Sequence, residues 1–204
     1  QPFSSVGYAL LNSTYSGDDL LELSRFSGSG GTNRLYAGFG AYIFKGFSVG
    51  AEASFIFGNI ENNIFNQRNV SLGTKYEEEL NIRGGQFKFG AQYETELKNK
   101  LKFNTGALVV LESDLSATGS ERLYSLTLSS AGIEQGRDTL YARSISGNIT
   151  MPYKAAFGVG LGKTDKWYVG INQEFREAIT YNGINTATDG YQYESRRKFS
   201  MGGY

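Results

Sequence analysis

The chain has 204 residues, a mass of 22.4 kDa and a formal net charge of zero, from 20 basic and 20 acidic side chains. It contains no cysteine and no histidine, which excludes disulfides, thiolate nucleophiles, Ser-His-Asp triads and imidazole metal clusters. The neutral balance and a pI near 6.6 give no electrostatic footprint for nucleic acid. We therefore expect a chain that is not an enzyme and has no cofactor and no metal site.

Period-two alternation of apolar and polar residues predicts β-strands, because successive side chains of a strand point to opposite faces. The alternation occurs in eight segments, and it is weakest at the two ends of the chain: residues 3–11, 35–44, 47–58, 80–94, 101–111, 145–161, 167–175 and 192–203. At Gly84-Gly85 the apolar phase moves from even to odd numbers, which predicts a β-bulge. No apolar run approaches the ~20 residues that a membrane helix needs.

The connections between these segments alternate in length. Three are predicted to be tight turns: residues 45–46, 98–100 and 163–166. Four are predicted to be long polar loops, rich in Ser, Gly, Asn, Thr and Asp: residues 13–31, 59–75, 116–139 and 178–191. Short turns at one end and long loops at the other are typical of outer-membrane barrels. The prediction is one all-β domain over 1–204, an antiparallel up-and-down transmembrane β-barrel in the bacterial outer membrane, in contact with its lipid.

A soluble barrel with an apolar lumen is the main alternative fold, because period two does not say which face lies inside. The polar face is built from Gly, Ser, Asn, Gln and sparse charges rather than from dense Lys and Glu. This composition favours a polar lumen and an apolar face toward lipid.

Charged side chains on the polar face would then point into the lumen: Glu52, Lys88, Glu94, Lys102, Glu112, Lys154 and Glu174. Such charges must pair or stay hydrated, because an unpaired buried charge is costly. They either form a structural network of salt bridges or line a hydrophilic passage or substrate contact. The run Glu77-Glu78-Glu79 is predicted to be a solvated strand extension.

Aromatic residues gather near the short turns: Phe44, Phe47, Tyr93, Phe103, Trp167 and Tyr168. Tyr and Trp favour the membrane interface, where one end of the side chain is apolar and the other stays wet. These six residues are predicted to form an aromatic girdle. The alternative is that they reflect only the frequency of aromatics in strands.

Three groups of motifs carry a resemblance to a known family: QPFSSVGY at residues 1–8 with GSGGTN at 28–33; FSVG at 47–50 with SFIFGNIENN at 54–63; and MPYK at 151–154 with FGVGLG at 157–162 and KWYVG at 166–170. Together they resemble the Bacteroidetes branch of the FadL-type outer-membrane transporters of hydrophobic compounds. The resemblance implies a barrel of about fourteen strands with an N-terminal plug, which moves long-chain fatty acids or similar molecules. With about eight segments and no plug before Gln1, the chain reads as a fragment of such a barrel.

Two functions follow from this reading. The first is passage of a hydrophobic small molecule, which predicts an apolar pocket reached from the long-loop side. The second is a structural or secretion-associated barrel, since some relatives of the FadL-type family serve type IX secretion. It predicts a lumen blocked by paired charges, and a secretion or surface protein as partner on loops 59–75 or 116–139. A self-contained eight-stranded barrel, with a lumen filled by side chains, is a third possibility.

Overall fold

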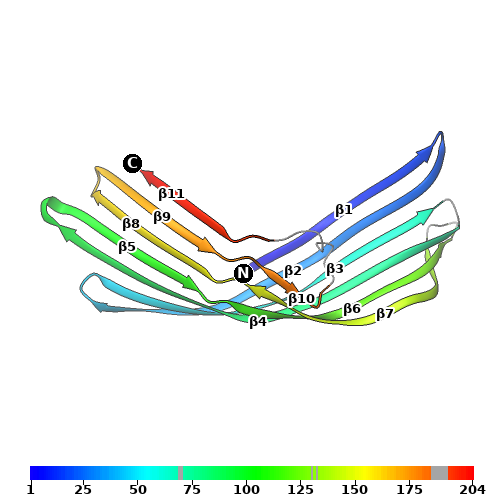
Figure 1. Ribbon diagram of the computed structural model, residues 1–204, viewed down its shortest axis with the longest axis horizontal. Helices are drawn as coiled ribbons and strands as arrows, with labels where there is room; N and C mark the ends of the chain where they lie inside the picture. Colours follow the sequence, from blue (N-terminus) through cyan, green and yellow to red (C-terminus); the bar gives the residue numbers. More distant parts are fainter. Residues whose placement is uncertain (69–70, 130, 132, 185–192) are drawn as a thin grey trace. The chain divides into compact units, whose positions relative to one another are not determined.

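The computed structural model describes residues 1–68, 71–129, 131, 133–184 and 193–204, and these residues are almost entirely β-strand (Figure 1). The described elements are β1 (Pro2–Ser16), β2 (Asp19–Phe44), β3 (Phe47–Arg68), β4 (Leu72–Leu97), the 3-10 turn η1 (Lys98–Lys100), β5 (Leu101–Val110), β6 (Ser113–Leu128), β7 (Glu134–Met151), β8 (Lys154–Lys163), β9 (Trp167–Arg176), β10 (Thr180–Asn182) and β11 (Arg196–Gly203). Every strand pair whose register is known is antiparallel. The predicted fold class, an all-β antiparallel sheet of the barrel type, is confirmed. Within these described ranges, no helix has the length and apolar character to span a membrane.

The chain divides into two compact units. Unit 1 comprises Gln1–Arg34, Ile56–Arg83 and Ser116–Asn148, and unit 2 comprises Leu35–Phe55, Gly84–Leu115 and Ile149–Tyr204.

Unit 1 has the ladder order β1-β2-β3-β4-β6-β7. The β1–β2 ladder ends in a two-residue turn, because Ser16 pairs with Asp19. The side chains of Ile56 and Leu126 are fully buried. On β4, neighbouring residues face opposite sides of the sheet, so Glu77 and Glu78 place a charge on each face. Within unit 1, β4 therefore has no continuous apolar face for lipid.

Unit 2 has the ladder order β2-β3-β4-β5-β8-β9-β11. Its strands β5, β8 and β9 match the 9–11 residues of a tilted membrane strand. One face of this ladder carries exposed apolar side chains at odd-numbered positions: Leu35, Phe39, Phe87, Phe89, Phe157, Ile171 and Met201. Phe39 is 71% exposed and Met201 is 74% exposed. A soluble barrel would bury this face, so the structure of unit 2 contradicts the soluble alternative.

The three predicted tight turns are confirmed. Lys45-Gly46 is a turn in which Gly46 has a φ of +83°, and a Cβ there would lie 2.0 Å from the Glu94 carbonyl oxygen. Lys98–Lys100 forms the 3-10 turn, and the last turn joins β8 to β9. Glycine is needed at Gly46 both for its backbone conformation and for the close approach of β4.

The predicted long loops are mostly wrong. Residues 13–31, 59–75 and 116–139 lie largely in β1, β2, β3, β4, β6 and β7, which continue as long strands. Their Ser, Asn and Gly residues favour turns in isolation, but ladder pairing outweighs this local preference. Thr180–Asn182 of the fourth loop is the short strand β10, and residues 185–192 lie outside the described residues. The predicted eight segments therefore become eleven described strands.

Two strand boundaries also differ from the prediction. The segment 145–161 is interrupted after Met151, where Pro152 cannot donate to a ladder. The β-bulge predicted at Gly84-Gly85 is wrong, because even-numbered residues of β4 are buried both before and after this point. At this point β4 changes its partner from β6 to β5. A Cβ on Gly84 would lie 2.6 Å from the Leu115 side chain, so the glycine permits a close approach.

Candidate functional site

Four of the seven charges predicted on the polar face form two ion pairs in unit 2. Lys88 Nζ lies 2.9 Å from Glu52 Oε1, between β4 and β3. Lys154 Nζ lies 2.9 Å from Glu174 Oε2, between β8 and β9. All four side chains are half-buried, so each pair is only partly screened by solvent.

The other three predicted charges are exposed and are not brought into these pairs. In the β4–β5 ladder, Glu94 is opposite Asn104, and Lys102 is opposite Glu96. Glu112 lies just after β5, outside any strand. Whether any of the seven charges acts on a solute or on a partner stays a prediction.

An open concavity of about 1320 Å³ lies on the polar face of unit 2 and is lined by all the strands of its ladder. The Glu52–Lys88 pair stands in its wall, together with small residues such as Gly90, Gly106 and Gly158. Glycines, the paired charges and apolar residues such as Val49, Leu108 and Val159 all border the concavity. Passage of a hydrophobic compound through it stays a prediction.

The six aromatic residues of the predicted girdle do not share one environment. Phe44 and Phe47 stack across the first tight turn, with ring centroids 5.0 Å apart. Trp167 is exposed, while Tyr168 lines the concavity and stacks on Tyr204 at 6.2 Å. Tyr93 and Phe103 are half-buried on β4 and β5. The girdle remains a prediction, with Tyr168 on the concave face.

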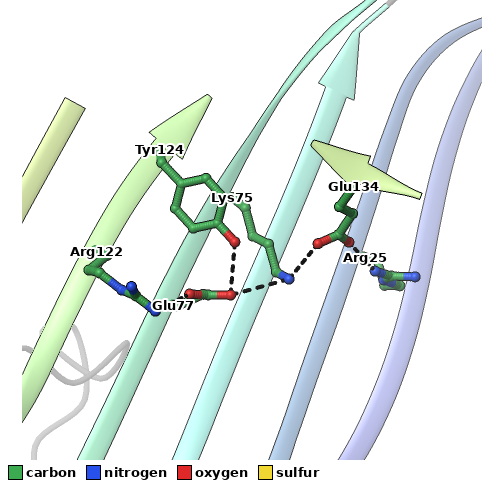
Figure 2. Close-up of polar contacts among 6 residues, drawn as sticks. All are labelled: Arg25, Lys75, Glu77, Arg122, Tyr124 and Glu134. Carbon is green, nitrogen blue, oxygen red and sulfur yellow. Dashed lines mark hydrogen bonds and ion pairs between the residues drawn. The ribbon is translucent and has the colours of Figure 1, made fainter. Parts of the chain in front are cut away.

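A network of charges lies in unit 1, where the sequence predicted loops (Figure 2). Glu134, the first residue of β7, accepts hydrogen bonds from Arg25 of β2 at 3.1 Å and from Lys75 of β4 at 2.7 Å. Lys75 Nζ also lies 3.2 Å from Glu77, which in turn binds Arg122 at 2.9 Å. The network thus ties β7 to β2 through one residue, although these strands are not neighbours in the ladder.

The electrostatics of this network favour the charged forms. Burial alone would lower the pKa of Lys75, but its hydrogen bonds to Glu134 and Glu77 outweigh this and raise the pKa above its usual value. Burial alone would raise the pKa of Glu77, but the Tyr124 hydroxyl and Lys75 outweigh it and lower the pKa. Tyr124 donates to Glu77 at 2.9 Å. Both groups are therefore held charged at neutral pH.

A second cluster surrounds Glu121, whose side chain is 2% exposed. The Tyr76 hydroxyl donates to its Oε2 at 2.7 Å, the Tyr141 hydroxyl donates to Oε1, and Arg143 pairs with Oε1. Burial alone would raise the pKa of Glu121, but these donors outweigh it and lower the pKa. The carboxylate is therefore a buried charge with every partner it needs.

Glu78 is directly opposite Glu121 in the β4–β6 ladder and is 7% exposed. Its Oε2 accepts a hydrogen bond from Asn62 at 2.9 Å. The middle residue of the acidic run is thus buried rather than solvated, which corrects the prediction for Glu78. The cause is the alternation of the strand, which turns every second residue inward.

Sequence reasoning missed both clusters because it placed Arg25, Lys75 and Glu134 of the first, and Glu121 of the second, in loops. Strand alternation in the upstream half of β4 would have found Tyr76, Glu78, Leu80 and Ile82 on one face. In the described part of the chain, no three His, Asp or Glu side chains gather to hold a metal ion.

Comparison with known proteins gives one family. The model of the BamG family matches residues 1–204, the whole of this chain, so the chain belongs to that family. BamG is an outer-membrane protein family distinct from the FadL-type transporters. No curated protein and no solved structure matches the chain.

The resemblance to FadL-type transporters is therefore wrong. The motifs that carried it are glycine- and aromatic-rich strand segments, such as residues 157–162, and alternation of this kind is shared by membrane barrels in general. The expectation of a plug and of a transporter fragment depended on that resemblance and falls with it.

Proposed function

We propose, from its membership of the BamG family, that the chain is an outer-membrane β-barrel protein that assists the assembly of other outer-membrane proteins. The family name relates it to the Bam complex, which supports a protein partner from the assembly machinery. We further propose that it works without an enzymatic step, as a scaffold. In this proposal, unit 2 meets the lipid and unit 1 meets the partner.

The network around Glu134 carries this proposal. Because one carboxylate binds both Arg25 and Lys75, the start of β7 is pinned across the unit to β2. Two partly exposed ion pairs on one residue cost entropy to hold and gain little individually, so their value lies in fixing geometry. A fixed, charged surface suits recognition of a partner and is a poor lining for passage of an apolar molecule.

The exposed apolar face of unit 2 supports the location. Phe157 of β8 is 52% exposed, and the neighbouring strand β9 also carries the exposed apolar side chains Ile171 and Phe175. A patch of this extent would be an aggregation hazard in water, whereas lipid covers it without cost. We therefore place unit 2 in the membrane and unit 1 outside the hydrocarbon.

Depletion of the protein in its host tests the proposed role against transport. We expect the abundance of several unrelated barrel proteins in the outer-membrane fraction to fall, as measured by quantitative mass spectrometry. Uptake of fatty acids and other apolar compounds, normalised to barrel abundance, should not change. Loss of uptake with normal barrel abundance would refute the assembly role and would favour passage of hydrophobic compounds instead.

A charge substitution tests whether unit 1 meets the partner. We expect Glu134→Gln to reduce co-purification with components of the assembly machinery, because Arg25 and Lys75 lose their shared carboxylate. Glu79→Gln removes an equal charge from an exposed position of β4 and is the matched control. Equal recovery of partners with both variants, at equal protein levels, would contradict a partner site in unit 1.

A further inference from the structure

The ladder of unit 2 has two edges, one on β2 and one on β11. Residues 35–44 of β2 pair with β3 on one side. On the other side, β1 pairs with the part of β2 that precedes residue 35, as far as the Gln1–Arg34 hydrogen bond. Along the described residues, β11 pairs with β9 alone. We call the space between residues 35–44 and Arg196–Gly203 the seam.

The two edges run in the same direction. β2 descends to the turn at 45–46, and each following pair in the order β2-β3-β4-β5-β8-β9-β11 reverses direction. The ladder thus has an odd number of strands, and direct pairing of β2 with β11 would be parallel. Bacterial outer-membrane barrels close with an even number of antiparallel strands, so one ascending strand is required at the seam.

Both edges line the same space. Gly38 and Tyr42 of β2, and Ser200 of β11, border the concavity of about 1320 Å³. Every residue from 35 to 44 is exposed, on both faces of the strand, and none is charged. Free strand edges are normally protected by charged side chains such as Lys, by Pro or by β-bulges. Residues 35–44 contain no charged residue and no Pro. The edge of β2 therefore has the composition of a strand that is covered.

We propose that an eighth strand fills the seam, antiparallel to both β2 and β11, and that it is the stretch of the same polypeptide that leads into Gln1. The backbone of Gln1 exchanges two hydrogen bonds with Arg34, at 2.7 and 3.0 Å, so the β1–β2 ladder is still in register at that point. A strand arriving at Gln1 from the seam continues this ladder along residues 35–44. We expect this eighth strand to have about ten residues, with apolar side chains on the face away from the concavity and small or polar side chains on the face toward it.

Photo-crosslinking in the full-length protein, in its native outer membrane, tests the occupant. Phe39→p-benzoylphenylalanine places the probe on β2, and Phe199→p-benzoylphenylalanine places it on β11; both side chains are well exposed. The same substitution at Phe89 of β4, an inner strand of the ladder, is the control. Crosslinked peptides are identified by mass spectrometry, and the mobility of the product is read on a denaturing gel.

We expect both edge probes to label one common peptide, the one leading into Gln1, with no increase in the mass of the product. The probe at Phe89 should label only β3 or β5. Three outcomes would overturn the proposal: labelling of β11 from Phe39, which means direct closure; a product enlarged by a second polypeptide, which means a strand supplied in trans; and lipid adducts alone from both edges. None of these outcomes bears on the assembly role, so the two proposals fail separately.

Discussion

Substitution of Glu121 by Gln removes one buried charge of unit 1 while keeping its shape. The carboxylate is 2% exposed and accepts hydrogen bonds from Tyr76 and Tyr141 beside Arg143. A hydrogen bond to a charged group contributes about 1.5–3 kcal/mol, and one between neutral groups about 0.5–1.5 kcal/mol. Each hydroxyl bond therefore weakens by about 1 kcal/mol, and the total is about 2 kcal/mol.

The assay is hydrogen exchange of the folded protein in lipid vesicles, followed on peptides from residues 116–148. A loss of about 2 kcal/mol corresponds to ~30-fold faster exchange if these strands open as a unit. Glu79→Gln, on the exposed face of β4, is the matched control and should change exchange by less than about threefold. Equal exchange in the two variants would refute the view that Glu121 is a stabilising charge.

The pH dependence has a definite sign. The pKa of Glu121 is lowered in the folded state, so its contribution is fully present above the ordinary glutamate pKa and is lost as the pH falls through the folded value. The protection factors of residues 116–148 in the wild-type protein, which correct exchange for its intrinsic pH dependence, should therefore fall below about pH 4.3, the ordinary value for glutamate. The Glu121→Gln variant should show a flatter profile over the same range, and a profile as steep as the wild type would assign the acid sensitivity to other groups.

Two further substitutions test packing and lipid contact. We expect Gly84→Ala to destabilise the protein by about 1–3 kcal/mol, because the added Cβ would lie 2.6 Å from the Leu115 side chain. Gly136→Ala is the control and should be nearly neutral, because its Cβ would have nothing within 4 Å. Urea titrations of the protein in lipid vesicles measure both changes. We expect Phe157→Arg to cost about 2–4 kcal/mol of insertion free energy, and Gln92→Arg, on the concave face, to cost little. The folded fraction in lipid vesicles, read on a gel, measures both costs. Equal costs would mean that Phe157 does not face lipid.

The fold class could be predicted from the sequence because strand alternation is a local property of the chain. Phe39 and Phe157 are exposed on the face that the pattern indicated, and the tight turn at Lys45-Gly46 carries its own glycine signal. The same alternation put Lys88 and Glu52 on the polar face, where the structure pairs them.

The clusters of unit 1 could not be predicted in the same way. Arg25, Lys75 and Glu134 lie far apart in the sequence, in stretches whose Ser, Asn and Gly content indicates loops. Their strands are held by pairing with partners distant in the chain, which no local window shows. The family was misread for a related reason, since glycine- and aromatic-rich strands are common to barrels of many families.

The pairing of β5 with β8 bears on the order in which the protein folds. Val110 pairs with Lys154, a separation of 44 residues (154 − 110), and the intervening chain forms β6 and β7. Closing such an interval costs entropy that grows only slowly with length, but non-local contacts of this kind slow folding. If β6 and β7 form their own hairpin first, they shorten the interval before β5 meets β8. We therefore expect residues 116–148 to act as an internal folding aid, so that substitutions that destabilise the β6–β7 hairpin delay the appearance of unit 2 more than they weaken the finished ladder.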